Sequence, residues 1–327
     1  MRQLPIKWGI SLPNRGALFG LASVDELIET AVFAEHTGVF ESVWFGDSLI
    51  HKPRLEAITM LAAVATHTKR ARLGTICMAS FPVRHPVLLA IQWASLDQLS
   101  KGRALLGVCI GGAHEGELRA FGVKREERVG RMKEGIELLR KIWGEETFTH
   151  RGKYYTLENY DIVPKPVQKP PPIWIAVSPE REQVGDKIVD QAMRRVGLLA
   201  DGYITMGVTA EELGKRLRVI EQTASEIGKD LSSFEIAIHG MVNINDDKQA
   251  AYTQSKDYFN HYYGPTYPPE SLIKVWLAHG PPKDCARLIQ QWIDMGITTP
   301  VLRFTAKDQI TQVKRFIAEV LPLLRLN

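Results

Sequence analysis

The stretch ARLGTICMA, Ala71–Ala79, is a short run of apolar and β-branched residues that precedes a helical pattern at Pro86–Leu99. Units of this kind recur, and eight such runs lie along the chain. Strands that alternate with helices form right-handed βαβ units, which build a parallel sheet. We therefore expect strands at Ile6–Leu12, Ser42–Gly46, Ala71–Ala79, Ala104–Ile110, Ile173–Ser178, Gly202–Met206, Phe234–Ile244 and Pro300–Phe304.

Eight units in 327 residues predict a closed (β/α)8 TIM barrel, with residues 1–327 as a single domain. The alternative is an open doubly wound sheet, which usually has a glycine-rich turn directly after its first strand. Here Ser11–Gly16 reads SLPNRG, without the G-x-G-x-x-G pattern. The barrel is the better prediction, and it places any active site at the C-terminal ends of the strands.

The composition excludes several classes of function. The 41 basic and 37 acidic residues leave a net charge of only +4, and the two signs are interspersed, so we expect no nucleic-acid partner. The three cysteines, Cys77, Cys109 and Cys285, are far apart and lack metal-ligand spacing, which argues against zinc and favours reduced thiols in the cytoplasm. Lys7 interrupts the only early apolar run, and no run reaches the ~20 residues of a membrane span.

Several segments carry local signals. Ser23-Val24-Asp25-Glu26 is a capping-box pattern at the start of an amphipathic helix. The segment Gly144–Pro172 is expected to be an insertion that holds a small β-hairpin and a proline-rich lead-in. The segment Phe259–Gly280 is a long aromatic stretch, which favours a lid or pocket wall over a disordered loop.

The third and fourth strands end in small or apolar residues. Gly74 suggests a bulge in the third strand, and the residues after it form either a flat wall for an aromatic ring or ordinary core packing. His114 and Glu115 follow the glycines Gly111 and Gly112 at the end of the fourth strand. They are the titratable pair nearest to the expected barrel mouth, although a loop histidine without any role is the competing interpretation.

The fourth unit resembles a known family. A helix end reading Leu-Asp-x-Leu-Ser-x-Gly-Arg at residues 96–103 leads into a strand that ends in glycines, and Phe121-Gly122 follows. Further matches are Ser42-Val43-Trp44 with Asp47, the proline-rich run at residues 164–175, and Ala200-Asp201-Gly202-Tyr203. Their order and spacing resemble the luciferase-like superfamily of flavin- and deazaflavin-dependent oxidoreductases, to which bacterial luciferase belongs.

The resemblance implies a (β/α)8 enzyme that binds a reduced cofactor in the barrel mouth. We expect FMN as a separate reduced cosubstrate, supplied by a flavin reductase, and a monooxygenase reaction on a small organic molecule through a flavin hydroperoxide. The alternative is hydride transfer with the deazaflavin coenzyme F420, without oxygen. A second alternative is a flavin-binding protein without catalysis.

The chain departs from the family pattern at three places. The acid-histidine pair after the second strand reads Asp47-Ser48 here, so the usual proton-transfer group is missing and Ser48 supplies only a hydrogen bond. The candidate catalytic residues are therefore Asp47, Ser48, His114 and Glu115. Ile110 stands where luciferases have a phosphate-binding arginine, and Cys109 stands at the position of their reactive thiol, although a small core residue is the simpler interpretation.

The fifth unit has an apparent insertion after Ser178, and its helix is expected to start near Asp190, where its N-terminus suits a phosphate group. By resemblance we also expect a non-proline cis peptide at Ile76–Cys77 and a homodimer through the second and third helices, whose apolar residues include Ala57, Met60, Leu61, Val64, Leu88 and Ile91. The expected cofactor-binding residues are Ile76, Cys77, Met78, Gly111, Gly112, Ser178, Arg195 and Thr205.

Overall fold

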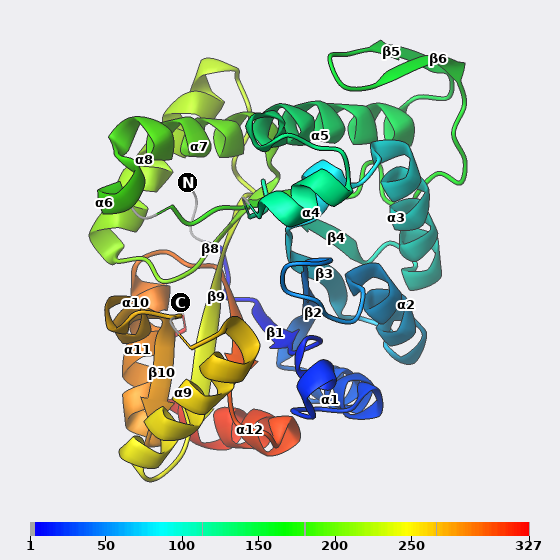
Figure 1. The fold of residues 1–327 in the computed structure, drawn as a ribbon. Coiled ribbons are helices and arrows are strands. Elements are labelled where there is room, and N and C mark those ends of the chain that lie inside the picture. The colour runs from blue at the N-terminus through cyan, green and yellow to red at the C-terminus, as the bar shows by residue number, and fades with distance from the viewer. Residues whose placement is uncertain (1–3, 113, 180, 266, 327) are drawn as a thin grey trace.

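The computed structural model describes residues 4–112, 114–179, 181–265 and 267–326. Eight parallel strands close into a barrel, in the order β1-β2-β3-β4-β7-β8-β9-β11, and β11 pairs with β1. Figure 1 looks onto the barrel with helices arranged around it. The predicted TIM barrel is confirmed, and its strands are β1 Trp8–Leu12, β2 Phe40–Asp47, β3 Arg72–Met78, β4 Ala104–Val108, β7 Ile173–Ala176, β8 Gly202–Thr205, β9 Glu235–Ile244 and β11 Thr299–Phe304.

A ring of helices surrounds the barrel, and shorter helices lie in the loops that follow the strands. The ring consists of α1 Val24–His36, α2 Ala57–His67, α3 Pro86–Ser100, α5 Arg128–Gly144, α7 Asp186–Leu199, α8 Ala210–Glu226, α11 Pro282–Asp294 and α12 Gln309–Arg315. The loop helices are α4 Glu115–Ala120, α6 Arg181–Val184, α9 Lys248–Tyr263 and α10 Glu270–Trp276. Short 3₁₀ turns lie at Gly16–Phe19, Phe81–Val83, Arg125–Glu127 and Leu321–Leu323, and a π-helical turn lies at Phe316–Val320.

The starts of two helices, α1 and α7, follow from the residues that precede them. Ser23 accepts a hydrogen bond from the backbone N–H of Glu26, whose carboxylate accepts one from the N–H of Ser23, so α1 begins with a complete capping box. The helix after the fifth barrel strand, α7, begins at Asp186 and not near Asp190, because Gly185 with φ of 80° allows the chain to turn directly into it.

Alternation of side chains along the strands divides the interior into two cores. Large apolar residues that point outward pack beneath the helices, and a smaller cluster fills the barrel itself. The inner cluster consists of Trp44, Ile76, Leu105, Trp174, Ile204, Ala237 and Val301. Continuing the alternation toward the C-terminal ends brings His239 of β9 and Arg303 of β11 above this cluster, where the mouth begins.

The segment Phe259–Gly280, for which the sequence favours a lid or pocket wall, is built largely from regular secondary structure. It contains the end of α9, the helix α10 and a ninth strand, β10 Leu277–Gly280, which pairs in parallel with β9. The segment and its neighbours form their own apolar cluster, in which aromatic rings stack on one another, so it is a packed wall. The cluster consists of Met241, Tyr258, Phe259, Tyr262, Ile273, Trp276 and Leu277.

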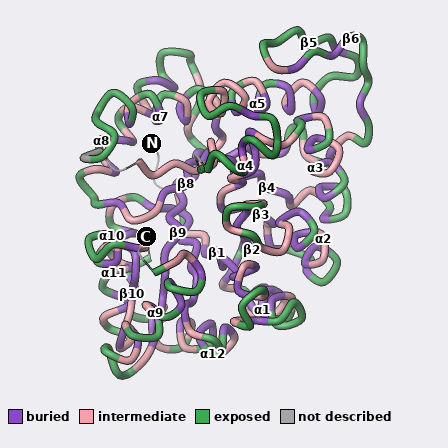
Figure 2. Tube along the Cα trace, in the orientation of Figure 1, coloured by how far each residue is buried: buried purple, intermediate pink, exposed green. Residues whose placement is uncertain are grey.

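An antiparallel hairpin lies between the fourth and fifth barrel units, where the sequence analysis expected one. Its strands are β5 Phe148–Arg151 and β6 Thr156–Tyr160, and Figure 2 shows it projecting beside the end of α5. Buried and exposed residues alternate along β5, whereas β6 is mostly exposed. Glu134 of α5 holds its turn, because the carboxylate accepts hydrogen bonds from the backbone N–H groups of residues 153–155.

The predicted bulge in β3 is present, but the predicted cis peptide is not. Phe45 pairs with Thr75 and Gly46 pairs with Cys77, so Ile76 is the extra residue. In the described part of the chain every cis peptide precedes a proline, namely Pro164, Pro170 and Pro268, and Ile76–Cys77 is trans. The bulge therefore bends the strand with ordinary peptide bonds, without the ~3–4 kcal/mol that a non-proline cis bond costs.

The expectation that all three cysteines are free thiols is also wrong. Cys77 and Cys109 form a disulfide, with their Cα atoms 5.8 Å apart, while Cys285 is a buried free thiol. The two residues are 32 positions apart in sequence, but they stand at the ends of the adjacent parallel strands β3 and β4.

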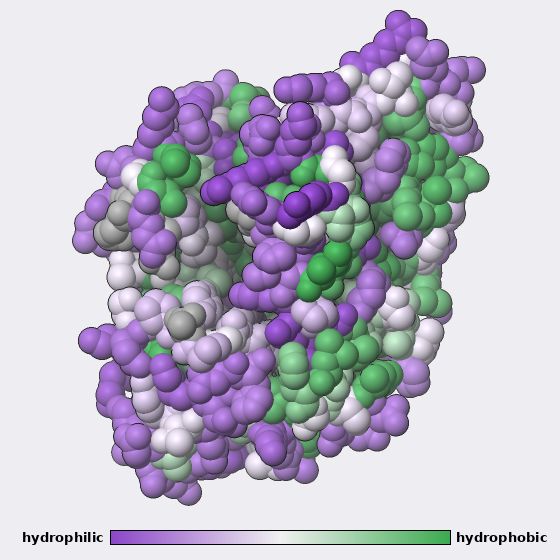
Figure 3. Space-filling view, in the orientation of Figure 1, coloured by the Kyte–Doolittle hydropathy of each residue, from purple (hydrophilic) through white to green (hydrophobic). Residues whose placement is uncertain are grey.

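The homodimer stays a prediction. Ala57, Met60, Leu61 and Val64 are buried within this chain, whereas Leu88 on α3 is 57% exposed and Leu99 is 47% exposed. Figure 3 shows hydrophobic surface on the side of the molecule where α2 and α3 lie. Among the helices that the structure describes, none combines the length and the apolar character needed to traverse a bilayer.

Candidate active site

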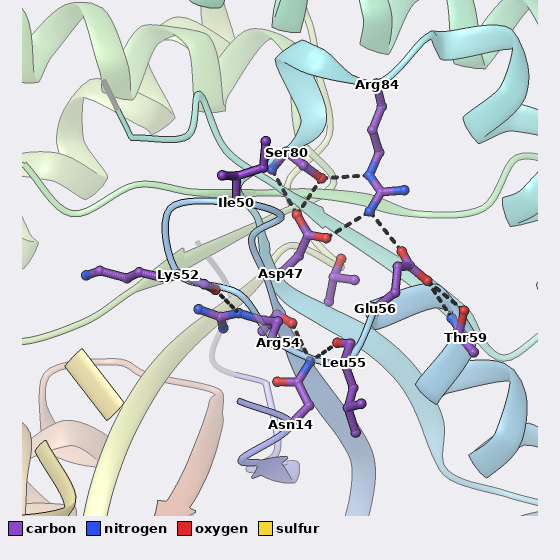
Figure 4. Close-up of polar contacts among 12 residues, drawn as sticks. Asn14, Asp47, Ile50, Lys52, Arg54, Leu55, Glu56, Thr59, Ser80 and Arg84 are labelled. Atoms are coloured by element: carbon purple, nitrogen blue, oxygen red, sulfur yellow. Dashed lines mark hydrogen bonds and ion pairs between the residues drawn. The ribbon is translucent and has the colours of Figure 1, made fainter. Parts of the chain in front are cut away.

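The C-terminal end of β2 carries a network of paired charges. Asp47 is almost fully buried, and its carboxylate accepts hydrogen bonds from the backbone N–H and the hydroxyl of Ser80, at 2.8 and 2.5 Å. The guanidinium of Arg84 lies 3.0 Å from Asp47 and 2.8 Å from Glu56 (Figure 4). Asp47 therefore orients the β3–α3 turn through its hydrogen bonds with Ser80 and its ion pair with Arg84.

Glu56 connects this network to the next helix. Its carboxylate accepts a hydrogen bond of 2.7 Å from the N–H of Thr59 and so caps α2. Burial alone would raise the pKa of Glu56, but the hydrogen bonds of Thr59 and the charge of Arg84 outweigh it and lower this pKa.

Two histidines face each other on the neighbouring side of the mouth. The rings of His51 and His114 stack with their centroids 4.1 Å apart, and Nδ1 of His114 accepts a hydrogen bond from the N–H of Glu117. Burial and the nearby His114 lower the pKa of His51. These side chains line a cavity of about 40 Å³ together with Ser48 and Gly112.

The structure places the two residues of the predicted pair, His114 and Glu115, in different surroundings. His114 reaches the cavity and meets a second histidine, whereas Glu115 is an exposed residue in the first turn of α4 and does not line that cavity. Glu117 lines this cavity instead, and its carboxylate accepts hydrogen bonds from the backbone N–H groups of Ile50 and His51.

The ends of β3 and β4 contribute apolar residues to the top of the inner cluster. Ile76 and Cys77 lie at the inner cluster, and Gly111, with φ of 67°, lies so close to the carbonyl of Ala79 that a side chain there would collide with it. Met78 belongs instead to the outer core beneath the helices and does not face the mouth, because the bulge at Ile76 shifts the alternation of side chains.

A polar group lies at the ends of β7 and β8. Ser178 donates a hydrogen bond of 2.5 Å to the carbonyl of Met206, and its hydroxyl lies 3.3 Å from that of Thr205. Arg216 of α8 is nearly buried and donates to both hydroxyls, at 3.4 and 3.2 Å. Arg195 lies half-buried on α7, and burial lowers its pKa.

A second group of charges lies at the ends of β1, β2 and β11. It consists of Arg15, Lys52, Arg54 and Arg303, which we call the cation cluster. Arg303 is only 1% exposed and donates hydrogen bonds to the hydroxyl of Ser11 and the carbonyl of Leu12, at 2.6 and 3.1 Å. Figure 3 shows this face of the molecule hollowed near the ends of β8 and β9.

The barrel and the glycines at the end of β4 agree with what the comparison with known proteins shows. Residues 6–299 match the family described as luciferase-like monooxygenase. The chain belongs to this luciferase-like family. Its resemblance to that family, inferred from residues 96–122 and the other motifs, is confirmed.

Curated relatives of this luciferase-like protein are similar along nearly the whole chain. An F420-dependent glucose-6-phosphate dehydrogenase of Kineococcus radiotolerans is 27% identical, over 92% of this chain and 93% of the relative. The protein of the same description from Amycolatopsis mediterranei is 26% identical, over 92% of this chain and 94% of the relative. The luciferase-like protein is therefore an oxidoreductase that acts with a flavin or a deazaflavin, and the alternative of a non-catalytic protein is set aside.

Solved structures share the fold. An F420-dependent secondary alcohol dehydrogenase, in complex with an F420–acetone adduct, has a TM-score of 0.79 at 19% identity and covers 98% of this chain and 100% of that chain. A monooxygenase from Streptomyces bottropensis has a TM-score of 0.79 at 21% identity and covers 97% of this chain and 99% of that chain. At these identities the likeness establishes the fold of the luciferase-like protein.

The luciferase-like site contains several residues that the sequence analysis did not select. Arg84, Arg216 and Glu117 act through contacts with residues far away in the sequence, and no local pattern marks them. Arg303 was open to prediction, because an arginine inside the apolar run Pro300–Phe304 is unusual in a buried strand. His239, within the expected strand Phe234–Ile244, gave a similar signal.

Proposed function

We propose that the protein is an F420-dependent oxidoreductase that transfers hydride between the deazaflavin and an organic substrate. The observation that carries the proposal is that the curated relatives reported above, similar over about nine-tenths of both chains, are F420-dependent dehydrogenases. This supports the deazaflavin alternative of the sequence analysis in place of its first interpretation, an FMN monooxygenase.

The residues of the mouth fit such a cofactor. Ile76, Cys77 and the glycine at 111 form a floor on which a planar ring can lie, and the close approach at Gly111 leaves no room for a side chain. Ser178 and Thr205 offer hydroxyl groups, and Arg195 carries a charge suited to a phosphate.

A second cation stands at the glycine turn itself. Arg128 at the start of α5 donates a hydrogen bond of 2.8 Å to the carbonyl of Gly111. Burial lowers the pKa of Arg128, and the nearby Arg125 lowers it further. We propose Arg128 and Arg195 as the phosphate-binding residues, in place of the arginine that luciferases carry after the cysteine.

A bound deazaflavin supplies a carbon atom that accepts or donates hydride. The protein must then take up or release the proton of the substrate hydroxyl. Burial and the nearby His114 lower the pKa of His51, so the ring of His51, stacked on that of His114, is suited to accept this proton. We propose this pair in place of the histidine that the family has where Ser48 stands here.

Equilibrium binding tests the cofactor directly. Oxidised F420 and oxidised FMN are titrated separately, and their fluorescence is followed. We expect tighter binding of F420, followed by oxygen-independent reduction of F420 with glucose 6-phosphate or a secondary alcohol as trial substrates. Tighter binding of FMN together with oxygen uptake would overturn the proposal.

A pH profile tests the proton-transfer pair. Replacing His51 by Asn should remove the acidic limb of the kcat/KM profile and lower the rate by about 10²–10⁴-fold, while binding of F420 is retained. Replacing the exposed His36, far away at the end of α1, is the control. An unchanged profile in His114→Asn and in His51→Asn would show that the proton is transferred elsewhere.

A further inference from the structure

The cation cluster has no acidic partner in the part of the chain that the structure describes. Arg15 follows β1, Lys52 and Arg54 lie in the loop between β2 and α2, and Arg303 belongs to β11. Among the described residues no carboxylate forms an ion pair with any of these four side chains, whereas Arg84 on the other side of the same loop pairs with two. Burial lowers the pKa of Lys52, and the charges of Arg54 and Arg15 lower it further.

Aromatic rings line the cluster without neutralising it. The guanidinium of Arg303 lies 5.0 Å from the ring centre of Tyr262, and that of Arg54 lies 5.8 Å from the same ring. The ammonium of Lys52 lies 5.6 Å from the rings of Tyr263 and Tyr267. Cation–π contacts of this kind are attractive, but the total positive charge remains uncompensated.

Buried polar atoms without partners surround the same place. The hydroxyls of Tyr258 and Tyr262 and Nε2 of His239 have no hydrogen-bond partner among the described residues, and all three side chains are more than nine-tenths buried. Nε of Arg15 is unpartnered as well. Burial, together with the charges of Arg303 and Arg54, lowers the pKa of His239 well below its ordinary value, which shows that it lies within the field of the cluster. An unpaired buried polar group is costly, so several together indicate a missing ligand.

The local backbone makes room for one of these charges. A side chain at position 46 would overlap Nη1 of Arg54, so glycine at the end of β2 allows the guanidinium to lie against the strand. Figure 4 shows Arg54 and Lys52 directed away from the side on which Asp47 meets Arg84. The chain thus separates its paired and unpaired cations across one loop.

The position in the barrel separates the cluster from the proposed cofactor residues. In the closed strand order, β1 stands opposite β7, and β11 stands opposite β4. Apart from Arg128 of α5 and Arg195 of α7, the residues assigned to the cofactor lie at the ends of β3, β4, β7 and β8, so the cation cluster occupies the remaining side of the mouth. A ligand held there lies beside the cofactor and does not replace it.

We propose that the cation cluster, with Tyr258, Tyr262 and His239, binds an anionic oxygen group of the substrate, a carboxylate or a phosphate ester. Guanidinium, ammonium and phenol groups all donate hydrogen bonds, so the site matches an acceptor-rich anion. An uncharged substrate such as an aliphatic aldehyde leaves the charges unpaired. That the anion belongs to the substrate rests on the proposed function, whereas the binding site itself does not.

Calorimetry on the full-length protein without cofactor tests the site. Inorganic phosphate and benzoate, titrated separately, represent the two sources of the anion. We expect at least one to bind, with an affinity that falls as ionic strength rises. Arg54→Gln and Arg15→Gln should each weaken binding of that probe by about tenfold or more, because each removes a charge-assisted hydrogen bond. Arg325→Gln, which removes an exposed cation near the C-terminus, should leave the affinity unchanged.

The outcomes are separable. Binding of phosphate alone assigns a phosphate ester, and binding of benzoate alone assigns a carboxylate. Binding of neither probe at millimolar concentrations, or equal affinity in the wild type, Arg54→Gln and Arg325→Gln, would overturn the site. If the anion binds as expected but F420 does not, the proposed function fails and the anion site stands. If F420 binds and neither anion does, the reverse holds.

Discussion

The loop between β2 and α2 divides two groups of charges that differ in one respect. On one side, Arg84 is held between Asp47 and Glu56, and every charge has a partner of opposite sign. On the other side, Arg54 and Lys52 lie among other cations and tyrosine rings, and neither side chain has an acidic partner within the described ranges. The ion pairs of the paired group stabilise the fold, whereas the cations of the unpaired group are available to bind an anionic ligand. Mutations should therefore affect stability on the first side and binding on the second.

The largest effect should come from breaking the paired group. Asp47→Ala leaves the nearly buried guanidinium of Arg84 without its inner partner, and the hydrogen bonds from Ser80 are also lost. Removing one member of a buried pair costs about 3 kcal/mol of unfolding free energy. Urea denaturation measures the loss, and Asp294→Ala, which breaks an exposed pair with Arg325, should cost under ~1 kcal/mol. Equal losses in both variants would show that Asp47 is not structural.

A smaller effect should appear as the pH is lowered. The pKa of Glu56 in the folded protein lies below its ordinary value of 4.5, so the folded state binds this proton less readily than the unfolded state. The stabilisation from Glu56 is present above pH 4.5 and is lost as the pH falls through the lowered pKa. Denaturation midpoints measured across this window should fall less steeply in Glu56→Gln than in the wild type. A steeper decline in the variant would contradict this sign.

The unpaired group should respond in the opposite direction. Arg54→Gln removes a charge that is repelled by Lys52 and Arg15, so the unfolding free energy without ligand should change by less than about 1 kcal/mol and should not fall. Thermal denaturation with and without inorganic phosphate measures both terms. We expect phosphate to stabilise the wild type more than the variant. A loss as large as that of Asp47→Ala would place Arg54 among the structural charges.

The smallest effect concerns the reactivity of one lysine. Because burial and neighbouring cations lower its pKa, Lys52 should react with an amine-acylating reagent at neutral pH faster than its accessibility alone predicts. Peptide mapping by mass spectrometry compares it with the exposed Lys124 as reference. Arg54→Gln should slow the reaction of Lys52 by raising its pKa and leave Lys124 unchanged. Faster labelling in the variant would mean that access, and not charge, controls the reaction.

The fold was open to prediction because its signals are local and repeated. The run Ala71–Ala79 predicts a strand and the cap Ser23 predicts the start of a helix, and neither prediction requires knowledge of the rest of the chain. The strand β10 was missed because Leu277–Gly280 is only four residues long and directly follows the helix α10, without a turn signal between them. The disulfide was missed because only the closed barrel brings Cys77 and Cys109 together.

The site was less open to prediction because it depends on pairing across the chain. The position of Asp47 was found from its motif, but its role is set by Arg84, 37 residues later. The same holds for the cation cluster, in which Arg15 and Arg303 stand at opposite ends of the sequence. The sequence identifies a charged residue. Whether that residue stabilises the fold or binds a ligand depends on whether the folded chain gives it a partner of opposite charge.

On one of its edges, the strand β9 pairs with two different strands along its length. Its first residues pair with β8, while Met241–Ile244 pair with β10, so the seam between β8 and β9 parts toward the mouth. The tyrosines of α9 are thereby tied, through β10, to a strand of the barrel itself. In hydrogen exchange, the amides of α10, β10 and the upper part of β9 should then exchange as one cooperative unit. Opening the wall above the cation cluster therefore requires breaking hydrogen bonds of a barrel strand.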